Sequence, residues 1–265
     1  MKIKIISIIG CALFLMGCGV AEMSIDENKD CGESISYDMV VGNPKEYKNC
    51  NIEWLAQIFL SPDVDDDGIY FQAYANAGEQ DDNFVAGYKN TDIELNDDDY
   101  IRIEGIFKEI SEGENAFGAE LSLPVIVVNN IEKVTRNDAV APTVQELNVN
   151  ETMSQNNFQV TLDKIEFADN ETRFYIKLKN DSSESVRFYT YDSKVVQDDK
   201  QFEEEYVSDD VDKLQSEILP GVEEDGVLVF PKLNHLSSIV LHLDEPSSSN
   251  YDLDWNMVKF DITSK

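Results

Sequence analysis

The stretch Asp99-Tyr100-Ile101-Arg102-Ile103-Glu104-Gly105-Ile106-Phe107-Lys108 alternates apolar and polar side chains with a period of two. Successive side chains of a β-strand point to opposite faces of its sheet, so the alternation predicts a strand with one buried face. Four further segments of the first half also combine apolar runs with flanking turn signals; they are residues 51–60, 69–74, 84–88 and 123–134. Five short strands predict a small closed or nearly closed barrel over residues 35–135.

Ahead of these strands, the spacing of apolar side chains in residues 35–47 predicts a short helix. We expect it to break near Gly42 and resume after Pro44, because proline fits the first turn of a helix but not its interior. Residues Asn43–Asn49, Asp99–Gly105 and Pro124–Ile126 resemble the OB-fold modules of Gram-positive lipoproteins. The resemblance implies an OB-like five-stranded barrel, although the glycine that such modules usually show near Asn49 is absent.

The second half is expected to form a separate domain. Residues 136–150 begin with a small, polar, proline-containing stretch that is typical of a linker. Strand patterns follow at residues 157–167, 173–180, 186–191, 226–230, 238–243 and 257–262. About seven short strands joined by antiparallel turns predict an immunoglobulin-like β-sandwich over residues 151–265, so the fold class is mostly β throughout.

Two motifs of this half carry a family resemblance. The segment Phe174–Ser182, and Leu219-Pro220-Gly221 followed by Gly226–Phe230, resemble the telokin-like, immunoglobulin-like domain of unknown function found at the C-terminus of bacterial lipoproteins. The motifs mark turns and core positions. The resemblance therefore implies a fold and brings no catalytic residue with it.

The N-terminus carries an export signal. Residues 1–17 combine a basic start, Met1–Lys4, with an uncharged apolar run that is too short, at about 12 residues, for a helix that spans a membrane. Leu15-Met16-Gly17-Cys18 resembles the lipobox of bacterial lipoproteins. The resemblance implies cleavage before Cys18, lipidation of its thiol, and anchoring at the extracytoplasmic face of the cell membrane. Residues 18–34 would then form a tether; the alternative is an ordinary secretory signal in which Cys18 is incidental.

The net charge of the chain indicates which classes of molecule it can bind. Without residues 1–17 the chain keeps all 53 acidic residues and loses Lys2 and Lys4 of its 21 basic ones, which leaves a formal charge of −34. Such a chain lacks the basic footprint that nucleic acids require. It would stay soluble and attract cations or basic partners. The runs Asp97–Asp99 and Glu203–Glu205 are interpreted as solvated loops, with partner-binding patches as the alternative.

Two cysteines are left to pair once Cys11 leaves with the signal and Cys18 carries lipid. A disulfide between Cys31 and Cys50 suits an oxidising exterior and would close a loop of about 20 residues, contributing roughly 3 kcal/mol. The alternative is two unpaired thiols. With only His235 and His242 beside them, the case for zinc is weak.

Two local constellations could bind a ligand. Asp63, Asp65 and Asp67 precede Gly68 and mimic the first half of an EF-hand loop, which makes calcium a hypothesis. The position that should carry the loop's glutamate holds Tyr74, so an acidic hairpin turn is the competing interpretation. Tyr70 and Tyr74 share one face of their predicted strand and could form a stacking surface, the alternative being a place in the core.

The sequence contains no catalytic motif: it has no Gly-x-Ser-x-Gly, no phosphate-binding glycine loop and no His-Glu-x-x-His. We therefore expect a non-enzymatic module that binds a protein or glycan of the cell envelope, without a cofactor unless calcium binds. A hydrolase of wall polymers and a calcium-responsive sensor are the rival hypotheses. The oligomeric state and the identity of the ligand stay open.

Overall fold

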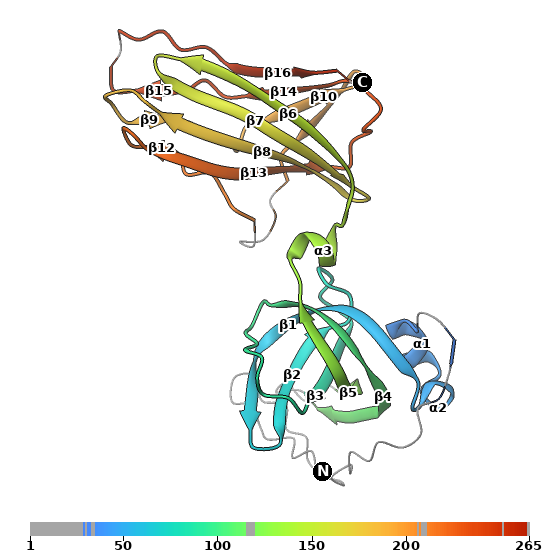
Figure 1. The fold of residues 1–265 in the computed structure, drawn as a ribbon. Helices are drawn as coiled ribbons and strands as arrows, with labels where there is room; N and C mark the ends of the chain where they lie inside the picture. The colour runs from blue at the N-terminus through green and yellow to red at the C-terminus, as the bar shows by residue number, and fades with distance from the viewer. Residues whose placement is uncertain are drawn as a thin grey trace. The chain divides into compact units, whose positions relative to one another are not determined.

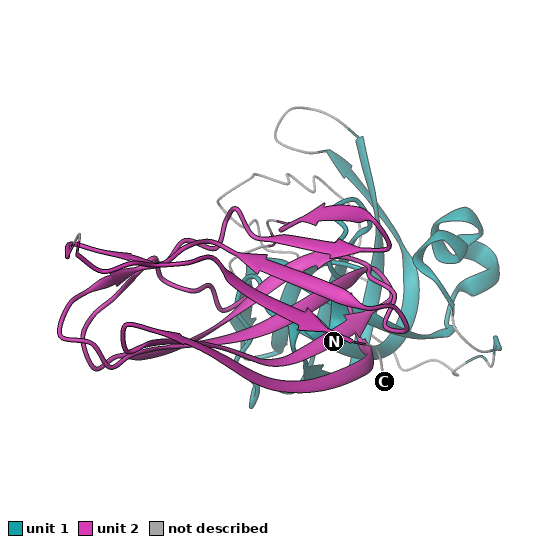
Figure 2. Cartoon of the chain, turned by 90° about the horizontal axis from the view of Figure 1, so that it is seen from above, with its two compact units in different colours: residues 1–140 teal, residues 141–265 magenta. Residues whose placement is uncertain are grey.

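The computed structural model describes residues 29, 31–32, 35–114, 120–205, 207, 211–250 and 252–263 (Figure 1). The expected signal peptide, Cys18 and most of the tether lie outside the described residues. The chain divides into two compact units, residues 1–140 and 141–265 (Figure 2). Both are built mainly from β-strands, which confirms the fold class expected from the sequence.

The first unit is a closed five-stranded barrel. Its elements are the helices α1 (Tyr37–Gly42) and α2 (Pro44–Tyr47) and the strands β1 (Asn51–Asp65), β2 (Gly68–Tyr74), β3 (Asn83–Tyr88), β4 (Tyr100–Glu114) and β5 (Glu120–Lys133). The strands follow one another around the barrel in the order β1-β2-β3-β5-β4, and β4 pairs with β1 to close it. All neighbours are antiparallel except β3 and β5. The ring is the OB-like barrel predicted from the five strand patterns.

Alternation along the strands places the barrel core. In β1 the inward side chains are Ile52, Trp54, Ala56 and Ile58, all buried. The indole Nε1 of Trp54 donates to the carbonyl of Ile35 at 2.8 Å, which satisfies its one buried polar atom. This hydrogen bond links the barrel core to the segment that precedes α1.

The expected helix break is present. Ser36 caps α1, and α1 ends at Gly42, while Pro44 opens α2 at a position where its missing N–H costs nothing. Three strands extend further than expected: β1 runs to Asp65, and β4 and β5 pair as far as Glu114 and Glu120. These extensions project beyond the core, so their side chains lack the apolar alternation on which the prediction relied.

The second unit is a β-sandwich. Its strands are β6 (Thr143–Gln155), β7 (Phe158–Ala168), β8 (Glu171–Asn180), β9 (Val186–Arg187), β10 (Lys194–Gln197), β11 (Lys200–Glu203), β12 (Glu217–Ile218), β13 (Glu223–Pro231), β14 (Ile239–Leu243), β15 (Ser247–Ser248) and β16 (Val258–Ile262). They form the sheets β13-β8-β7-β6, β11-β10-β14-β16 and the short β12-β9-β15. One hydrophobic cluster joins them, including Leu162, Phe174, Phe230, Leu241 and Phe260.

The predicted linker is wrong in most of its length. Residues Arg136–Val140 form helix α3, whose start is capped by Thr135, and β6 begins at Thr143. The sequence concealed β6 because it lies at the edge of its sheet and most of its side chains are exposed or half-buried. Leu147, Val149 and Met153 are half-buried at alternate positions and pack against the core, but residues 143–146 are exposed and Glu151 interrupts the series, so the apolar alternation is too short to predict the strand.

Within the described part of the chain, no helix combines the length and apolarity needed to cross a membrane.

Candidate functional site

The tyrosine surface expected on the barrel has the predicted geometry. Phe71 and Ala73 of β2 are buried in the core, whereas Tyr70 and Tyr74 are half-buried on the opposite face. The Tyr74 ring stacks on Phe59 of β1, with centroids 4.5 Å apart and planes 26° apart. Burial and the nearby carboxylates of the β1–β2 turn raise the pKa of Tyr70. One ring face of Tyr74 is therefore occupied by a neighbouring side chain.

The three aspartates proposed as calcium ligands do not converge. The Asp65 carboxylate accepts from the backbone N–H groups of Asp67 at 2.7 Å and Gly68 at 3.1 Å, so it closes the β1–β2 hairpin. Within the described ranges, the acidic group whose ligand atoms lie within 4.8 Å of one another is Glu79, Asp81 and Asp82, in the β2–β3 loop. The competing interpretation of the Asp63–Gly68 segment, an acidic turn, matches this arrangement.

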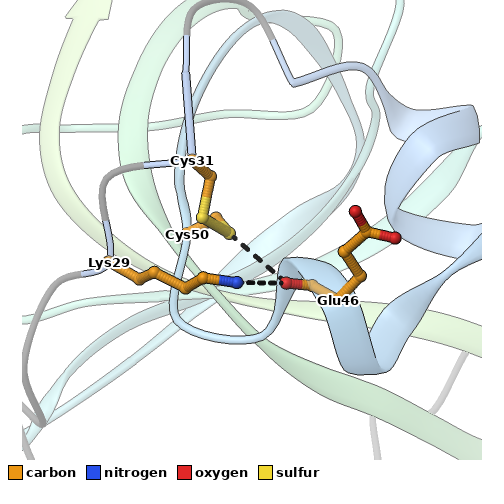
Figure 3. Close-up of a disulfide and its surroundings, with 4 residues drawn as sticks. All are labelled: Lys29, Cys31, Glu46 and Cys50. Atoms are coloured by element: carbon orange, nitrogen blue, oxygen red, sulfur yellow. Dashed lines mark hydrogen bonds between the residues drawn. A yellow bond between two sulfur atoms is a disulfide. The ribbon is translucent and has the colours of Figure 1, made fainter.

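Cys31 and Cys50 form a disulfide, with Cα atoms 5.7 Å apart (Figure 3). Cys50 is fully buried and lies immediately before β1. Its backbone forms an isolated parallel β-bridge with Lys29. The Lys29 ammonium donates to the carbonyl of Glu46 at 2.9 Å. Because both thiols are consumed, neither cysteine is available as a metal ligand or nucleophile.

Asn49 lies immediately before this disulfide and adopts a φ of 66°. That is the left-handed region, which glycine enters freely and asparagine tolerates better than most residues. Asparagine is thus a suitable non-glycine residue for this position.

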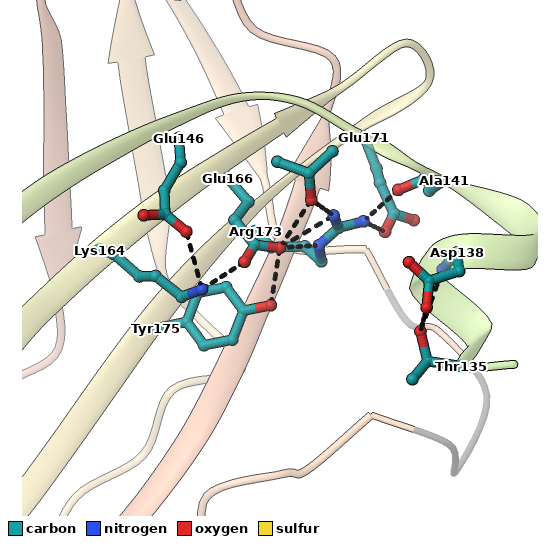
Figure 4. Close-up of polar contacts among 10 residues, drawn as sticks. Thr135, Asp138, Ala141, Glu146, Lys164, Glu166, Glu171, Arg173 and Tyr175 are labelled. Carbon is teal, nitrogen blue, oxygen red and sulfur yellow. Dashed lines mark hydrogen bonds and ion pairs between the residues drawn. The ribbon is translucent and has the colours of Figure 1, made fainter.

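A buried ion cluster occupies one end of the sandwich (Figure 4). Arg173 of β8 is 1% exposed, and its guanidinium lies 3.0 Å from Glu166 and 2.7 Å from Glu171. It also donates to the carbonyl of Ala141 and the hydroxyl of Thr143, both at 2.8 Å. These contacts fix the beginning of β6 against the β7–β8 hairpin.

Glu166 in this cluster is held ionised. Burial raises the pKa of its carboxyl, but hydrogen bonds from Lys164, Tyr175 and Arg173 outweigh burial and lower the pKa to about 2. Its Oε2 atom accepts from Thr143, Arg173 and Tyr175, and its Oε1 atom accepts from Lys164, so protonation of this carboxylate is strongly disfavoured. The cluster is therefore a structural element. Sequence reasoning missed it, although Glu166 and Arg173 face each other across the hairpin that it predicted.

The histidines do not meet in a site. His235 is exposed and packs edge-on against Phe167 at 5.9 Å, while His242 lies in β14, half-buried. Neither belongs to a group of potential metal ligands in the described ranges.

The second unit contains a pocket of about 320 Å³. Apolar side chains form most of its wall, among them Phe188, Val211, Leu214 and Leu228. Tyr189 and Tyr191 also line it; they are 38% and 70% exposed, and their rings meet edge to face at 5.7 Å. A pocket of this size with exposed aromatic rings has the dimensions of a small-ligand or side-chain site.

Three backbone hydrogen bonds build this pocket. Glu205 donates to the carbonyl of Val229, Val227 donates to Asp212, and Phe188 donates to Ser216. The first two bonds attach Glu205 and Asp212 to the edge of β13, the outermost strand of its sheet, and the third attaches Ser216 to Phe188, just after β9. At Gly226 the approach is so close that a Cβ atom would lie 2.5 Å from Cγ of Leu214.

Glu204 is a partly buried acidic residue of the pocket, whose lining also includes the polar residues Thr190, Glu205, Lys213 and Ser216. Its Oε2 atom is shielded from solvent and finds no hydrogen-bond partner within the described chain. Burial raises the pKa of the Glu204 carboxyl to about 7. The run Glu203–Glu205 was expected to be a solvated loop, but Glu203 is the last residue of strand β11 and Glu204 is partly buried, so the expectation holds for the exposed Glu205.

Comparison with known proteins adds little. No family model matches the chain. No curated protein sequence matches it either. Among solved structures, a functionally unknown protein from Listeria monocytogenes EGD-e is similar over 47% of this chain and 88% of its own, with 10% identity and a TM-score of 0.35.

Proposed function

We propose that the chain is a lipid-anchored protein of the cell surface that binds a protein or glycan of the envelope without catalysis. The observation that carries the binding role is the pocket of the second unit, with the exposed pair Tyr189 and Tyr191 at its wall. Aromatic rings held at a surface supply large contact areas at low entropic cost, which suits recognition.

Three described carboxyls, Asp82, Glu166 and Glu204, have a shifted pKa, and the chemistry of the two in the second unit favours binding over hydrolysis. Glu166 is an ionised group enclosed by donors, with a pKa of about 2. Among the described residues that line the pocket, Glu204 carries a shielded carboxyl oxygen and Glu205 is exposed. A glycosidase of the usual kind needs an acid and a second carboxylate that face one substrate bond. Among the described residues of the pocket, Glu204 has no second shielded acid beside it, which suits a binding group.

The anchor rests on the Leu15–Cys18 motif. A diacylglyceryl group holds a protein at a membrane firmly, because each buried methylene contributes about 0.8 kcal/mol. We expect Cys18→Ser to move the protein from the membrane fraction to the medium or the soluble extract, with Cys11→Ser as the control that leaves it in place. Full retention of the Cys18→Ser protein in washed membranes would contradict the anchor.

The binding role is tested by capture from cell envelopes, with the mature chain carrying Cys18→Ser as bait. We expect recovery of a specific protein or glycan that is lost with Tyr189→Ala/Tyr191→Ala. The matched control is Tyr70→Ala/Tyr74→Ala, which alters the barrel surface instead. If neither double variant reduced the recovery, or nothing were enriched over a bead control, the proposal would fail.

A further inference from the structure

Two described glutamates, Glu184 and Glu204, have an Oε2 atom that is shielded from solvent and lacks a hydrogen-bond partner, and Glu204 is the one of these two that lines the pocket of the second unit. That atom is removed from solvent, and no donor of the described chain reaches it. Burial is the one cause that raises its pKa, with no neighbouring charge contributing. Buried polar atoms in folded proteins nearly always have a partner, so an exception in a pocket indicates a partner supplied from outside.

The pocket around this carboxyl defines the shape of that partner. Val211, Leu214, Val227 and Leu228 give the wall an apolar character that suits an alkyl chain. Tyr189 and Tyr191 are exposed rings, and an aromatic face attracts a cation that passes over it. Glu205 and Lys213 also contribute to the lining.

A lysine side chain combines the features that this lining requires. It is a flexible four-carbon stem with a compact ammonium at its end, whereas arginine ends in a planar fork that prefers two carboxylate oxygens. The mature chain carries a formal charge of −34, since it keeps 53 acidic residues and 19 of the 21 basic ones after the loss of Lys2 and Lys4. Such a charge raises the rate at which a basic partner arrives.

We propose that this pocket receives a lysine side chain of a basic partner protein, with the ammonium paired to Glu204 and the stem against the apolar wall. The inference rests on the proposed binding function and names its partner's chemistry. Pairing would supply the Oε2 atom with the donor that it lacks in the unbound chain.

The test is a titration of the isotope-labelled mature chain, carrying Cys18→Ser, with the peptide acetyl-Gly-Gly-Lys-Gly-Gly-amide, followed by NMR. The matched probe has norleucine in place of lysine, so it keeps the stem and lacks the charge. We expect saturable shifts at Tyr189, Tyr191 and Leu228 with the lysine peptide, and binding at least tenfold weaker with norleucine. Because both probes meet the same wild-type protein, this comparison does not depend on whether a variant folds.

Two variants test which carboxylate pairs with the lysine ammonium. Glu204→Gln keeps the shape of the side chain and removes its charge, and we expect it to weaken lysine-peptide binding at least tenfold. Glu203→Gln removes the same formal charge from an exposed position outside the pocket lining and should change binding less than twofold. Equal binding of both peptides, or equal effects of both variants, would overturn the inference.

The proposed function is tested separately by capture from envelopes. If Glu204→Gln bait recovered the same partner as the wild type, the lysine inference would fail and the binding function would stand. If the wild-type bait recovered nothing specific, the binding function itself would fail.

Discussion

Arg173 and Glu166 form an ion pair that is almost completely enclosed: their side chains are 1% and 10% exposed, and Nη2 lies 3.0 Å from Oε2. Glu171 binds the same guanidinium at 2.7 Å, so one buried cation faces two carboxylates. A buried pair of this kind adds modest net stability over an apolar replacement, but it is costly to break. The guanidinium also donates to the carbonyl of Ala141 and the hydroxyl of Thr143. These hydrogen bonds hold the start of β6, the first strand of the sandwich, in place.

Removal of the cation is therefore expected to destabilise the sandwich strongly. Arg173→Met leaves Glu166 and Glu171 buried without their shared partner, and we expect a loss of about 3 to 5 kcal/mol in the free energy of unfolding. Lys164→Met is the control, because Lys164 is 28% exposed and its loss leaves Glu166 its other donors; about 1 kcal/mol is expected. Urea unfolding followed by Trp255 fluorescence in a Trp54→Phe background measures both. Equal losses would contradict the central role of Arg173.

The same cluster predicts how acid affects the sandwich. The pKa of Glu166 is about 2 in the folded chain and near 4.5 when unpaired, so between these values the unfolded state binds more protons. The stability that Glu166 contributes is thus complete above pH 4.5 and disappears as the pH falls through 2. We expect the difference in unfolding free energy between wild type and Glu166→Gln to shrink over that range. A difference independent of pH from 5 to 2 would show that the charge of Glu166 is unimportant.

The Cys31–Cys50 disulfide should stabilise the barrel alone. Its ring spans a sequence separation of 19, for which loop-closure entropy predicts about 3 kcal/mol. We expect Cys31→Ser/Cys50→Ala to lose about this much in urea unfolding followed by Trp54 fluorescence, with Trp255 replaced by Phe. Reductant should destabilise the wild type by a similar amount and leave the double variant unchanged. A wild type insensitive to reductant would refute the prediction.

The sequence predicted the strands that have one face buried in the core and the other exposed to solvent. Strand β4 was located correctly because Ile101 and Ile103 are buried while Arg102 and Glu104 point outward. Strand β6 was mistaken for a linker because an edge strand buries little on either face. The periodicity of apolar residues in a sequence reflects which side chains are buried. It does not reflect which backbone segments pair, so a paired strand with exposed side chains cannot be recognised from it.

The candidate site was hidden for a different reason. Glu204 stands between two exposed glutamates, and its burial depends on segments 204–205 and 211–216 attaching to β13. Those attachments are backbone hydrogen bonds, which side-chain patterns do not encode. The Asp63–Gly68 stretch looked more specific because local spacing suggested convergence, yet its Asp65 carboxylate is used by its own turn.

Glu204 predicts a pH effect of opposite sign to that of Glu166. Its pKa is raised to about 7 in the folded chain from 4.5, so the folded state binds more protons between these values. The contribution of the neutral carboxyl to stability is complete below pH 4.5 and is lost as the pH rises through 7. We expect Glu204→Gln to become progressively more stable than wild type from pH 4.5 to 8, in urea unfolding followed by Trp255 fluorescence. A constant difference would show that Glu204 titrates as an exposed acid; Lys213 and Glu205, the other charged groups of the pocket, are unchanged in this comparison.

The close approach of segment 211–216 to Gly226 predicts that a larger residue at this position disturbs the pocket. A Cβ atom there would lie 2.5 Å from Cγ of Leu214 and 2.8 Å from its backbone nitrogen, and backbone cannot yield as a side-chain end can. We expect Gly226→Ala to displace segment 211–216 from β13 and to cost about 1 to 3 kcal/mol, the range for overpacking. Gly42→Ala is the control, because nothing lies within 4 Å of the added methyl and alanine favours the helix that Gly42 ends. Faster exchange of the Val227 amide hydrogen, which donates to Asp212, would locate the damage in the pocket. Unchanged exchange together with unchanged stability would mean that the segment accommodates the methyl, and that the pocket wall is less constrained than the contact with Leu214 implies.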